Sequence, residues 1–384
     1  MKYRRRVQKN LDIVEVFIEK IVPGGKGMGY LDQKVVFVSD ALAGEKHRVQ
    51  LIKDKKDFCE GYSIEVLVAS KDRVKPRCLA YGNCGGCDFQ FTHYENQLVL
   101  KKQMIKDSFS RLAKLTLGEE FKVAPSPKSW GYRTRARLSQ LASKNILGFK
   151  ERKGSKIVNL DTCPVLSNEV SRVLKARRNL NPDDVEVSIQ SNGKQIVAKS
   201  KTPIEIVVQG KTLKATTDVF FQSNLEILPI FLDWILARTP NGGLALDLFS
   251  GVGFFAVFLE EKFDKVIAVE RNKGCLELAK ENVTDKTEFY TGDVTEWSQL
   301  KQSHNVDFLI VDPPREGLDA KVLAQIQSWK PESWIYVSCN PVTLARDTKR
   351  VMDAGIYQVK ASQAFDFYPQ TSHCEMVIQF ILIN

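Results

Sequence analysis

The sequence predicts an α/β protein with a doubly wound, Rossmann-like C-terminal domain preceded by two regions of mainly β-structure. From about Thr239, apolar runs of strand length alternate with runs of helix length, as in a parallel sheet covered by helices. Residues 10–69 instead hold short strands separated by glycines, and residues 120–220 return to a strand-like pattern. At 384 residues the chain can form several domains, and we expect three, at 1–70, 71–220 and 221–384.

Residues 10–69 have the pattern of a small β-barrel. Four short alternating runs recur at even spacing, and a glycine-rich stretch lies between the first two; the runs are Ile13–Ile18, Val35–Val38, His47–Ile52 and Ser63–Val68. Strands of this length and spacing are typical of small barrels that bind oligonucleotides. A barrel that binds nothing is the alternative.

The positive charge of the chain is concentrated in its middle. The whole chain has a formal net charge of +10. Residues 71–220 hold 28 Lys and Arg against 14 Asp and Glu, a net charge of +14, whereas residues 221–384 hold 15 against 22, a net charge of −7. A concentrated basic region indicates a polyanionic partner such as RNA. A solvated basic surface is the alternative.

Nothing in the sequence predicts a membrane or secreted protein. No apolar run approaches the roughly 20 residues of a membrane span. The N-terminus, Met1–Arg6, lacks the apolar core of a signal peptide. We therefore expect a cytoplasmic monomer with no structural disulfides among its eight cysteines.

The middle region contains a predicted helix and a row of arginines. The helix, about Asn96–Leu115, could pack on the C-terminal domain. Its apolar face would carry Leu98, Ile105, Phe109 and Leu112, and its other face Lys101, Lys102, Lys106 and Lys114. Farther along, Arg133, Arg135 and Arg137 would lie on one side of a strand. Three adjacent like charges need neutralising, so phosphate contact is expected, with a plain solvated face as the alternative.

The C-terminal domain opens with a strand and a glycine turn that suit a nucleotide-type cofactor. The expected strands of this domain are 244–248, 266–269, 288–290, 308–311, 334–337, 359–365 and 376–383. Gly251-x-Gly253-x-x-Ala256 follows the first of them and would bring free backbone N–H groups close to a ligand. The glycines fit both a dinucleotide and S-adenosylmethionine, so they do not separate the two.

Acidic residues at successive strand ends favour the methyl donor. Asp247, directly before the loop, would repel a pyrophosphate but suits the ammonium group of a methionine moiety. Glu270 can accept hydrogen bonds from ribose hydroxyls, and Asp293 could bind the adenine amine. Each acid alone would more often be a cap or turn residue. Together with Gly251 they predict an S-adenosylmethionine site.

Two further strand ends carry reactive groups. Asp312 is followed by two prolines, which hold it rigidly, and then by Arg315, where enzymes that methylate exocyclic amines have an aromatic residue. Cys339 ends the next strand and is followed by Asn340-Pro341, which delivers a thiol to the ligand-binding edge of the sheet. Alone, such a cysteine would more often be a buried structural thiol.

A cysteine, a carboxylate and a methyl donor are the minimum set for methylation of uracil carbon 5. Carbon 5 is too weakly nucleophilic unless a thiolate first adds to carbon 6. A base must then remove the carbon 5 proton. Cys339 and Glu375, together with the donor loop, supply this set.

These residues resemble those of the RNA uracil-5 methyltransferases, over nearly the whole chain. The motifs in the family's order are Asp312-Pro-Pro-Arg315, Ser338-Cys-Asn-Pro341 and Phe367-Tyr-Pro-Gln-Thr-Ser-His-Cys-Glu375. The resemblance implies Cys339 as nucleophile, Glu375 as proton acceptor, and Gln222, Phe249, Glu270 and Asp312 as lining of the donor or target site. Residues 10–69 are similar to the family's TRAM barrel. The sequence departs from the family at two positions. Phe254 stands where many members have Asn, and Cys374 stands where an aliphatic residue is usual, so that it is a second candidate for the nucleophilic thiol.

Four cysteines are spaced for a metal cofactor. Cys78, Cys84 and Cys87 lie close together among glycines, and Cys163-Pro164 follows much later. This spacing favours a [4Fe–4S] cluster over a zinc site, which more often has two paired CxxC motifs. The ribosomal-RNA branch of the resembled family carries a cluster at these positions. We expect it to hold the basic middle domain together.

The sequence therefore predicts S-adenosylmethionine-dependent formation of 5-methyluridine in structured RNA, with large-subunit ribosomal RNA ahead of transfer RNA. The target base would leave its stack to reach Cys339. Cytosine-5 methylation is the nearest alternative, and it commonly uses a second cysteine for which Cys374 is the one candidate. A non-catalytic RNA-binding or iron–sulfur sensor protein is a third.

Overall fold

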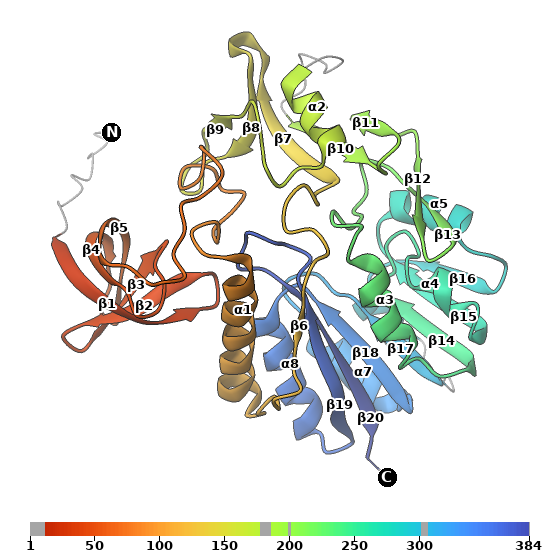
Figure 1. The fold of residues 1–384 in the computed structure, drawn as a ribbon. Helices are drawn as coiled ribbons and strands as arrows, with labels where there is room; N and C mark the ends of the chain where they lie inside the picture. The colour runs from red at the N-terminus through yellow and green to blue at the C-terminus, as the bar shows by residue number, and fades with distance from the viewer. Residues whose placement is uncertain (1–11, 177–185, 199–200, 301–305, 384) are drawn as a thin grey trace, which may run out of the picture.

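The computed structural model describes residues 12–176, 186–198, 201–300 and 306–383, so the basic run Met1–Arg6 lies outside the described residues. The chain forms an N-terminal barrel, a small antiparallel sheet and a large mixed sheet with helices on both sides (Figure 1). The α/β architecture expected from the sequence is confirmed. Among the described residues, no helix has the length and apolar character needed to cross a membrane.

The barrel is closed by five strands in the order β1-β2-β3-β5-β4. The strands are β1 (Ile13–Val22), β2 (Lys26–Leu31), β3 (Lys34–Ser39), β4 (Lys46–Asp54) and β5 (Phe58–Val68). Strand β2 was not expected, because glycines are rare in strands. Strand β2 needs a glycine at position 29, because a Cβ there would lie 2.0 Å from the carbonyl oxygen of Phe17 on β1.

The small sheet has the order β11-β10-β7-β8-β9 and lies at the top of Figure 1. Helix α2 (Asn168–Ala176) packs Val170 and Leu174 into its core. The strands are β7 (Arg135–Leu141), β8 (Ile146–Lys150), β9 (Ile157–Asn159), β10 (Glu186–Ser191) and β11 (Ile196–Ala198), with a 3-10 turn at Ala142–Lys144.

The row of arginines predicted in this sheet is not a free basic face. Arg135 donates to Gln190 and to the backbone carbonyls of Thr216 and Thr217. Arg133 stacks on the ring of Phe149, with 5.3 Å between its guanidinium carbon and the ring centroid. Arg137 is exposed and pairs with Glu186. The expectation of three free guanidinium groups on one side of a strand was wrong, because β7 begins at Arg135 and because Arg133 and Arg135 contact groups within the protein. Phosphate contact itself stays a prediction.

The large sheet has eight strands in the order β16-β15-β14-β17-β18-β20-β19-β6. The first five are parallel, and β20 pairs antiparallel with β18. Those in the predicted C-terminal domain are β14 (Gly242–Leu248), β15 (Phe263–Glu270), β16 (Thr287–Thr291), β17 (Phe308–Val311), β18 (Ser333–Ser338), β19 (Tyr357–Phe365) and β20 (Glu375–Leu382). Each of the first six contains a strand expected from the sequence, and β20 overlaps the expected strand 376–383 except for its last residue.

Helices and one hairpin cover this sheet. The helices are α3 (Leu228–Leu236), α4 (Ala256–Leu259), α5 (Lys273–Asn282), α6 (Val294–Leu300), α7 (Ala320–Trp329) and α8 (Pro341–Asp353). The hairpin β12 (Ile204–Val208) and β13 (Lys211–Ala215) packs Ile206 and Leu213 into the same core as α3 and α4.

A segment from the middle of the chain also packs on this sheet. Helix α1 (Tyr94–Ser108) continues into a π-helical turn, Phe109–Ala113, and leads to β6 (Val123–Ala124), which pairs with β19 (Figure 1). Two details of the predicted helix were wrong. Leu112 is 42% exposed, because the wider turn rotates it out of the core. Lys101 is not on a solvated face but is fully buried against Asp366.

Candidate active site and cysteine cavity

The predicted site residues of the large sheet follow one edge of it. Parallel strands end at the same edge, so residues that follow neighbouring strands lie side by side. In sheet order these are Asp293 after β16, Glu270 at the end of β15, Phe249 after β14, Asp312 after β17 and Cys339 after β18.

Cys339 lies between the end of β18 and the start of α8. The Asn340 side chain caps α8 by accepting a hydrogen bond from the Val342 backbone N–H, and it donates to the carbonyl oxygen of Arg315. Burial raises the pKa of the Cys339 thiol to about 11, and Glu375 and Asp312 add to that shift. Arg315 acts in the opposite direction, as does the N-terminus of a helix, because both favour the thiolate.

Glu375 is the first residue of β20 and is only 2% exposed. The last antiparallel pair of β18 and β20 joins Ser338 to Met376, so Cys339 and Glu375 lie one position beyond it on adjacent strands. Burial raises the pKa of Glu375 well above its usual range, and the nearby Asp312 raises it further. A hydrogen bond with Tyr368 and the charge of Arg315 oppose this shift.

A cavity of about 380 Å³ borders Cys339. The turn after β1, helix α1 and the segment before β20 line it, through Pro23, Gly24, Met104, Ser372 and His373 among others. Cys374 also borders this cavity, but it is 2% exposed and packs in the apolar core of the sheet. Complete burial raises the pKa of Cys374 to about 12, which disfavours its thiolate.

Two acidic neighbours accept hydrogen bonds from the backbone of the donor loop and the residues that follow it. Gly251 donates its backbone N–H to Glu270, at 3.1 Å, and Asn272 donates to the other carboxylate oxygen. Asp247 accepts the backbone N–H of Ala256 at 3.0 Å. Burial raises the pKa of Asp247 to about 8, with smaller contributions from Asp312 and Glu270. Phe249 has a left-handed backbone, with φ of 65°.

Several buried polar atoms around this loop have no hydrogen-bond partner among the described residues. They are Oδ1 of Asp247, Oγ of Ser250 and Oε1 of Gln222. The segment of Gln222 reaches the loop through Phe221, whose ring packs edge-on against Phe254 at 6.1 Å. Buried polar groups are nearly always satisfied. The residues therefore fit a polar cofactor such as S-adenosylmethionine. Asp293 caps α6 by accepting from Thr295.

The four predicted metal-binding cysteines line one cavity, although Cys163 is far from the others in sequence. Cys78, Cys84, Cys87 and Cys163 share it with Arg133 and Phe149. Gly86 donates its backbone N–H to the Cys84 sulfur at 3.4 Å. Burial raises the pKa of Cys87 to about 12. In the described part of the chain, no three His, Cys, Asp or Glu side chains are arranged to hold a single metal ion.

Two contacts of this site were not found from the sequence. Tyr368 acts on the pKa of Glu375, and the Lys101–Asp366 pair holds the segment between β19 and β20, with 2.6 Å between Nζ and Oδ1. An aromatic residue seven positions before a candidate base is a weak signal. Lys101 lay in a run of lysines that reads as a solvated face.

Comparison with protein families identifies the chain. A family model described as tRNA (Uracil-5-)-methyltransferase matches residues 165–290 and 293–382, more than half of the chain. The chain belongs to the tRNA (uracil-5-)-methyltransferase family. A TRAM domain model matches residues 8–64, which confirms the predicted barrel. This family member is therefore an RNA (uracil-5-)-methyltransferase that uses S-adenosylmethionine.

Relatives of this family member share its full length. An RNA methyltransferase of Treponema denticola is 31% identical over 93% of this chain and 96% of its own. A 23S rRNA (uracil(1939)-C(5))-methyltransferase of Shewanella amazonensis is 31% identical over 94% of each chain. A Pyrococcus abyssi tRNA (uracil-54, C5)-methyltransferase, solved with S-adenosyl-L-homocysteine, shares the fold with a TM-score of 0.75 at 22% identity, over 96% of this chain and 100% of its own.

Proposed function

We propose that this enzyme methylates carbon 5 of one uridine in large-subunit ribosomal RNA, with Cys339 as nucleophile and Glu375 as proton acceptor. The observation that carries the proposal is their adjacency beyond the Ser338–Met376 pair, at the edge that also bears the donor loop. A ring between them can meet the thiol at carbon 6 and the carboxylate at carbon 5.

Cys339 starts the reaction. Its Sγ, as thiolate, forms a bond to carbon 6 of the uracil, and the electron pair of the 5,6 double bond moves to carbon 5 and the carbonyl oxygen. Arg315 assists because it favours the thiolate. Carbon 5 then takes a methyl group, which S-adenosylmethionine supplies when bound.

Glu375 completes the reaction. Its carboxylate removes the proton from the methylated carbon 5, the 5,6 double bond reforms, and the bond between Sγ and carbon 6 breaks to release the thiolate. The raised pKa of Glu375 makes it a stronger base once it is ionised. Asp312, whose pKa burial raises to about 7, lies close enough to affect the pKa of both reactive groups.

The donor loop would hold the methyl donor. Asp247 would face the ammonium group of S-adenosylmethionine, Glu270 its ribose hydroxyls and Asp293 its adenine, while Gln222, Phe249 and Gly251 would complete the lining. The unpartnered oxygens of Asp247 and Gln222 support this assignment, because a bound polar ligand would satisfy them.

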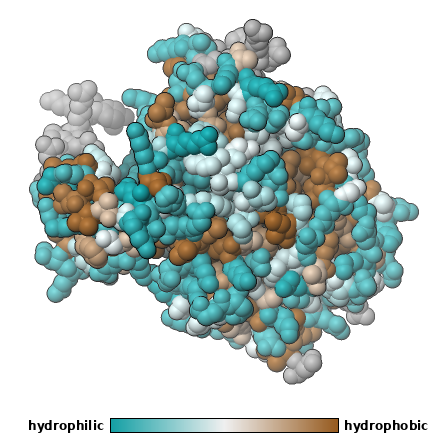
Figure 2. Space-filling model, in the orientation of Figure 1, coloured by the Kyte–Doolittle hydropathy of each residue, from teal (hydrophilic) through white to brown (hydrophobic). Residues whose placement is uncertain are grey.

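Ribosomal RNA is the proposed substrate because the relative that acts on 23S rRNA is 31% identical over 94% of each chain. The middle region, with its net charge of +14, would bind the phosphate backbone. The barrel exposes apolar side chains, seen as brown patches at the left of Figure 2. Three of its aromatic residues, Phe17, Tyr30 and Tyr62, are each more than 40% exposed. Exposed rings of this kind stack on unpaired bases.

The four cysteines are proposed to bind a [4Fe–4S] cluster. They line one cavity in which Arg133 and backbone N–H groups face the sulfurs, and such donors stabilise cluster thiolates. The spacing of the four cysteines supports this cluster over a zinc ion, because zinc sites more often have two paired CxxC motifs. We keep the division into residues 1–70, 71–220 and 221–384 as the domain proposal, with strand β6 and the β12–β13 hairpin of the middle region packed on the C-terminal domain.

Two measurements test the proposed function. The wild-type enzyme should form a covalent adduct with RNA that carries 5-fluorouridine, whereas Cys339→Ala should form none and Cys374→Ala should still form it. An undiminished adduct in Cys339→Ala would refute the assignment. Mapping 5-methyluridine in total RNA from a strain without this protein should show one site lost in large-subunit ribosomal RNA; loss from transfer RNA, or of 5-methylcytidine, would contradict the proposed substrate.

A further inference from the structure

The segment that carries three of the cysteines is bonded directly to the segment that ends in Glu375. We call residues 78–91 the cysteine segment and residues 366–375 the catalytic loop. Asp88, next to Cys87, accepts the Ser372 backbone N–H on Oδ1 at 2.7 Å and the Ser372 hydroxyl on Oδ2 at 2.8 Å. The backbone N–H groups of Asp88 and Phe89 both donate to the carbonyl oxygen of Gln370.

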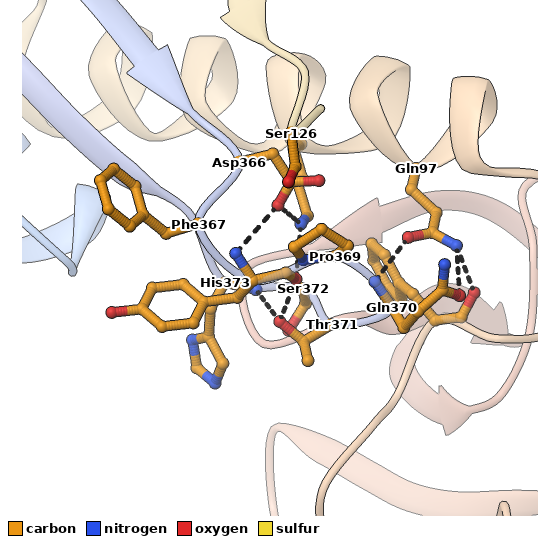
Figure 3. Close-up of polar contacts among 12 residues, drawn as sticks. Gln97, Ser126, Asp366, Phe367, Pro369, Gln370, Thr371, Ser372 and His373 are labelled. Carbon is orange, nitrogen blue, oxygen red and sulfur yellow. Dashed lines mark hydrogen bonds and ion pairs between the residues drawn. The ribbon is translucent and has the colours of Figure 1, made fainter. Parts of the chain in front are cut away.

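These bonds hold the catalytic loop in a strained conformation. Gln370 has φ of 69°, a left-handed backbone that a residue with a side chain adopts only when its surroundings require it. Figure 3 shows how Gln97 of α1 faces it: Gln97 accepts the Gln370 backbone N–H at 2.9 Å and donates to the Gln370 side chain at 3.0 Å. Without these partners the loop would relax toward an unstrained backbone.

The other end of the loop is fixed as well. Lys101 donates to Asp366 and to the carbonyl oxygen of Tyr368, and Tyr132 donates to the carbonyl oxygen of Pro369. The backbone is thus fixed at residues 366–369 and again at Ser372. Because Glu375 follows Ser372 by three residues, a shift of Ser372 should also move Glu375. Cys339 is held separately, by β18 and by the cap of α8.

The cysteine segment has a second set of bonds, to the barrel. Arg152 donates to both carboxylate oxygens of Asp40 and to the carbonyl oxygen of Cys87, and Tyr81 donates to Asp40 at 2.6 Å. Asp40, which accepts a hydrogen bond from this segment, and Asp88, which belongs to it, are thus comparable carboxylates at its two contacts. The first faces the barrel, and the second faces the catalytic loop.

We propose that Asp88 is a positioning residue for proton removal: through Ser372 it places Glu375, so that the cysteine segment controls the second half of the reaction and not the first. The inference rests on the proposed roles of Cys339 and Glu375. A displaced Glu375 leaves the bond between Sγ and carbon 6 intact after methyl transfer, because the carbon 5 proton stays in place. If the contact between Asp88 and Ser372 is removed, we expect the enzyme to remain covalently bound to the methylated RNA.

The test follows the covalent complex on natural RNA, without 5-fluorouridine. Asp88→Ala, given S-adenosylmethionine and substrate RNA, should accumulate a methylated adduct on denaturing gels and lose roughly tenfold to a hundredfold in kcat, as displacements of about 1 Å do. The KM for RNA should fall with kcat, because only the step after adduct formation is slowed. Asp88→Asn should restore turnover, because its oxygen can accept from the Ser372 N–H and its amide can donate to the hydroxyl. Asp40→Ala is the matched control and should show no adduct.

A second readout needs no turnover. Hydrogen exchange of the peptide that covers residues 366–375 should be faster in Asp88→Ala than in wild type and unchanged in Asp40→Ala. If Asp88→Ala unfolds, Ser372→Ala replaces it, since that change removes the hydroxyl bond and leaves the backbone bond.

The variant Glu375→Gln distinguishes a failure of the positioning role of Asp88 from a failure of the proposed role of Glu375 as the base. If it traps adduct but Asp88→Ala and Ser372→Ala do not, the positioning role is wrong and the proposed function stands. If Glu375→Gln traps none, the assignment of the base is wrong. Equal adduct in Asp88→Ala and Asp40→Ala would also overturn the inference, because general loosening of the cysteine segment would then explain both.

Discussion

Cys339 and Glu375 lie side by side on adjacent antiparallel strands, one position beyond the Ser338–Met376 pair. The thiol and the carboxylate come from opposite ends of their strands: β18 ends at Ser338 and β20 begins at Glu375. Strand β20 runs antiparallel to both of its neighbours. Its first residue, Glu375, therefore lies at the edge of the sheet where the parallel strands end. A sheet with parallel strands alone would place the carboxylate at the far edge.

The pH dependence of turnover should report the hydrogen bond between Tyr368 and Glu375. The base must be ionised, so activity falls as the pH drops through the raised pKa of Glu375. Tyr368 lowers this pKa, so Tyr368→Phe should raise it and move the acidic limb of the kcat profile to higher pH. The profile is measured on methyl transfer to RNA. An acidic limb that stays in place or moves to lower pH would show that another group limits activity.

Glu270→Gln should weaken binding of S-adenosylhomocysteine. Both carboxylate oxygens of Glu270 accept backbone N–H groups, from Gly251 and Asn272. An amide would turn an NH₂ group toward one of these donors, and hydrogen bonds to charged groups contribute about 1.5–3 kcal/mol. Calorimetric titration should show affinity lower by roughly tenfold or more. Glu277→Gln, on the exposed side of α5, is the control and should bind as wild type does.

Lys101→Met should destabilise the fold strongly. Lys101 and Asp366 are both fully buried and lie 2.6 Å apart, so loss of the lysine leaves an unpaired buried charge. Breaking such a pair from one side costs about 3–5 kcal/mol in the free energy of unfolding. Urea denaturation measures the loss. The double variant Lys101→Met/Asp366→Asn should recover part of it, because the amide still accepts the Tyr368 N–H; no recovery would mean that packing, not charge, explains the cost.

Removal of any one of the four cavity cysteines should lower both stability and RNA affinity. Cys78→Ser, Cys84→Ser, Cys87→Ser and Cys163→Ser each take one ligand from the proposed cluster, so bound iron and the midpoint of thermal unfolding should fall together. Cys59→Ser, in the barrel core, should leave the iron content unchanged. If the four variants kept full RNA affinity and thermal stability, a cluster that clamps the middle domain would be excluded.

Much of the fold could be predicted from local pattern. The strands of the large sheet were expected because their apolar runs are continuous, and the barrel was expected from short alternating runs. Strand β2 was missed because its glycines are needed for a close approach to β1, which is a property of the pair. Strand β6 was missed because two residues have no pattern of their own. Lys101, Arg133 and Arg135 were misread because their partners lie far away in the sequence.

The sequence by itself determined which residues follow each strand of the sheet, and so which groups reach its edge. It also determined that four cysteines and a basic middle region accompany them. Only the tertiary structure decided which of these groups meet. It placed Glu375 beside Cys339, brought Cys163 to the cavity of Cys78, Cys84 and Cys87, and joined Asp88 to Ser372. The reason is physical: periodicity reports the environment of each segment, whereas pairing between distant segments depends on the packing of the whole chain.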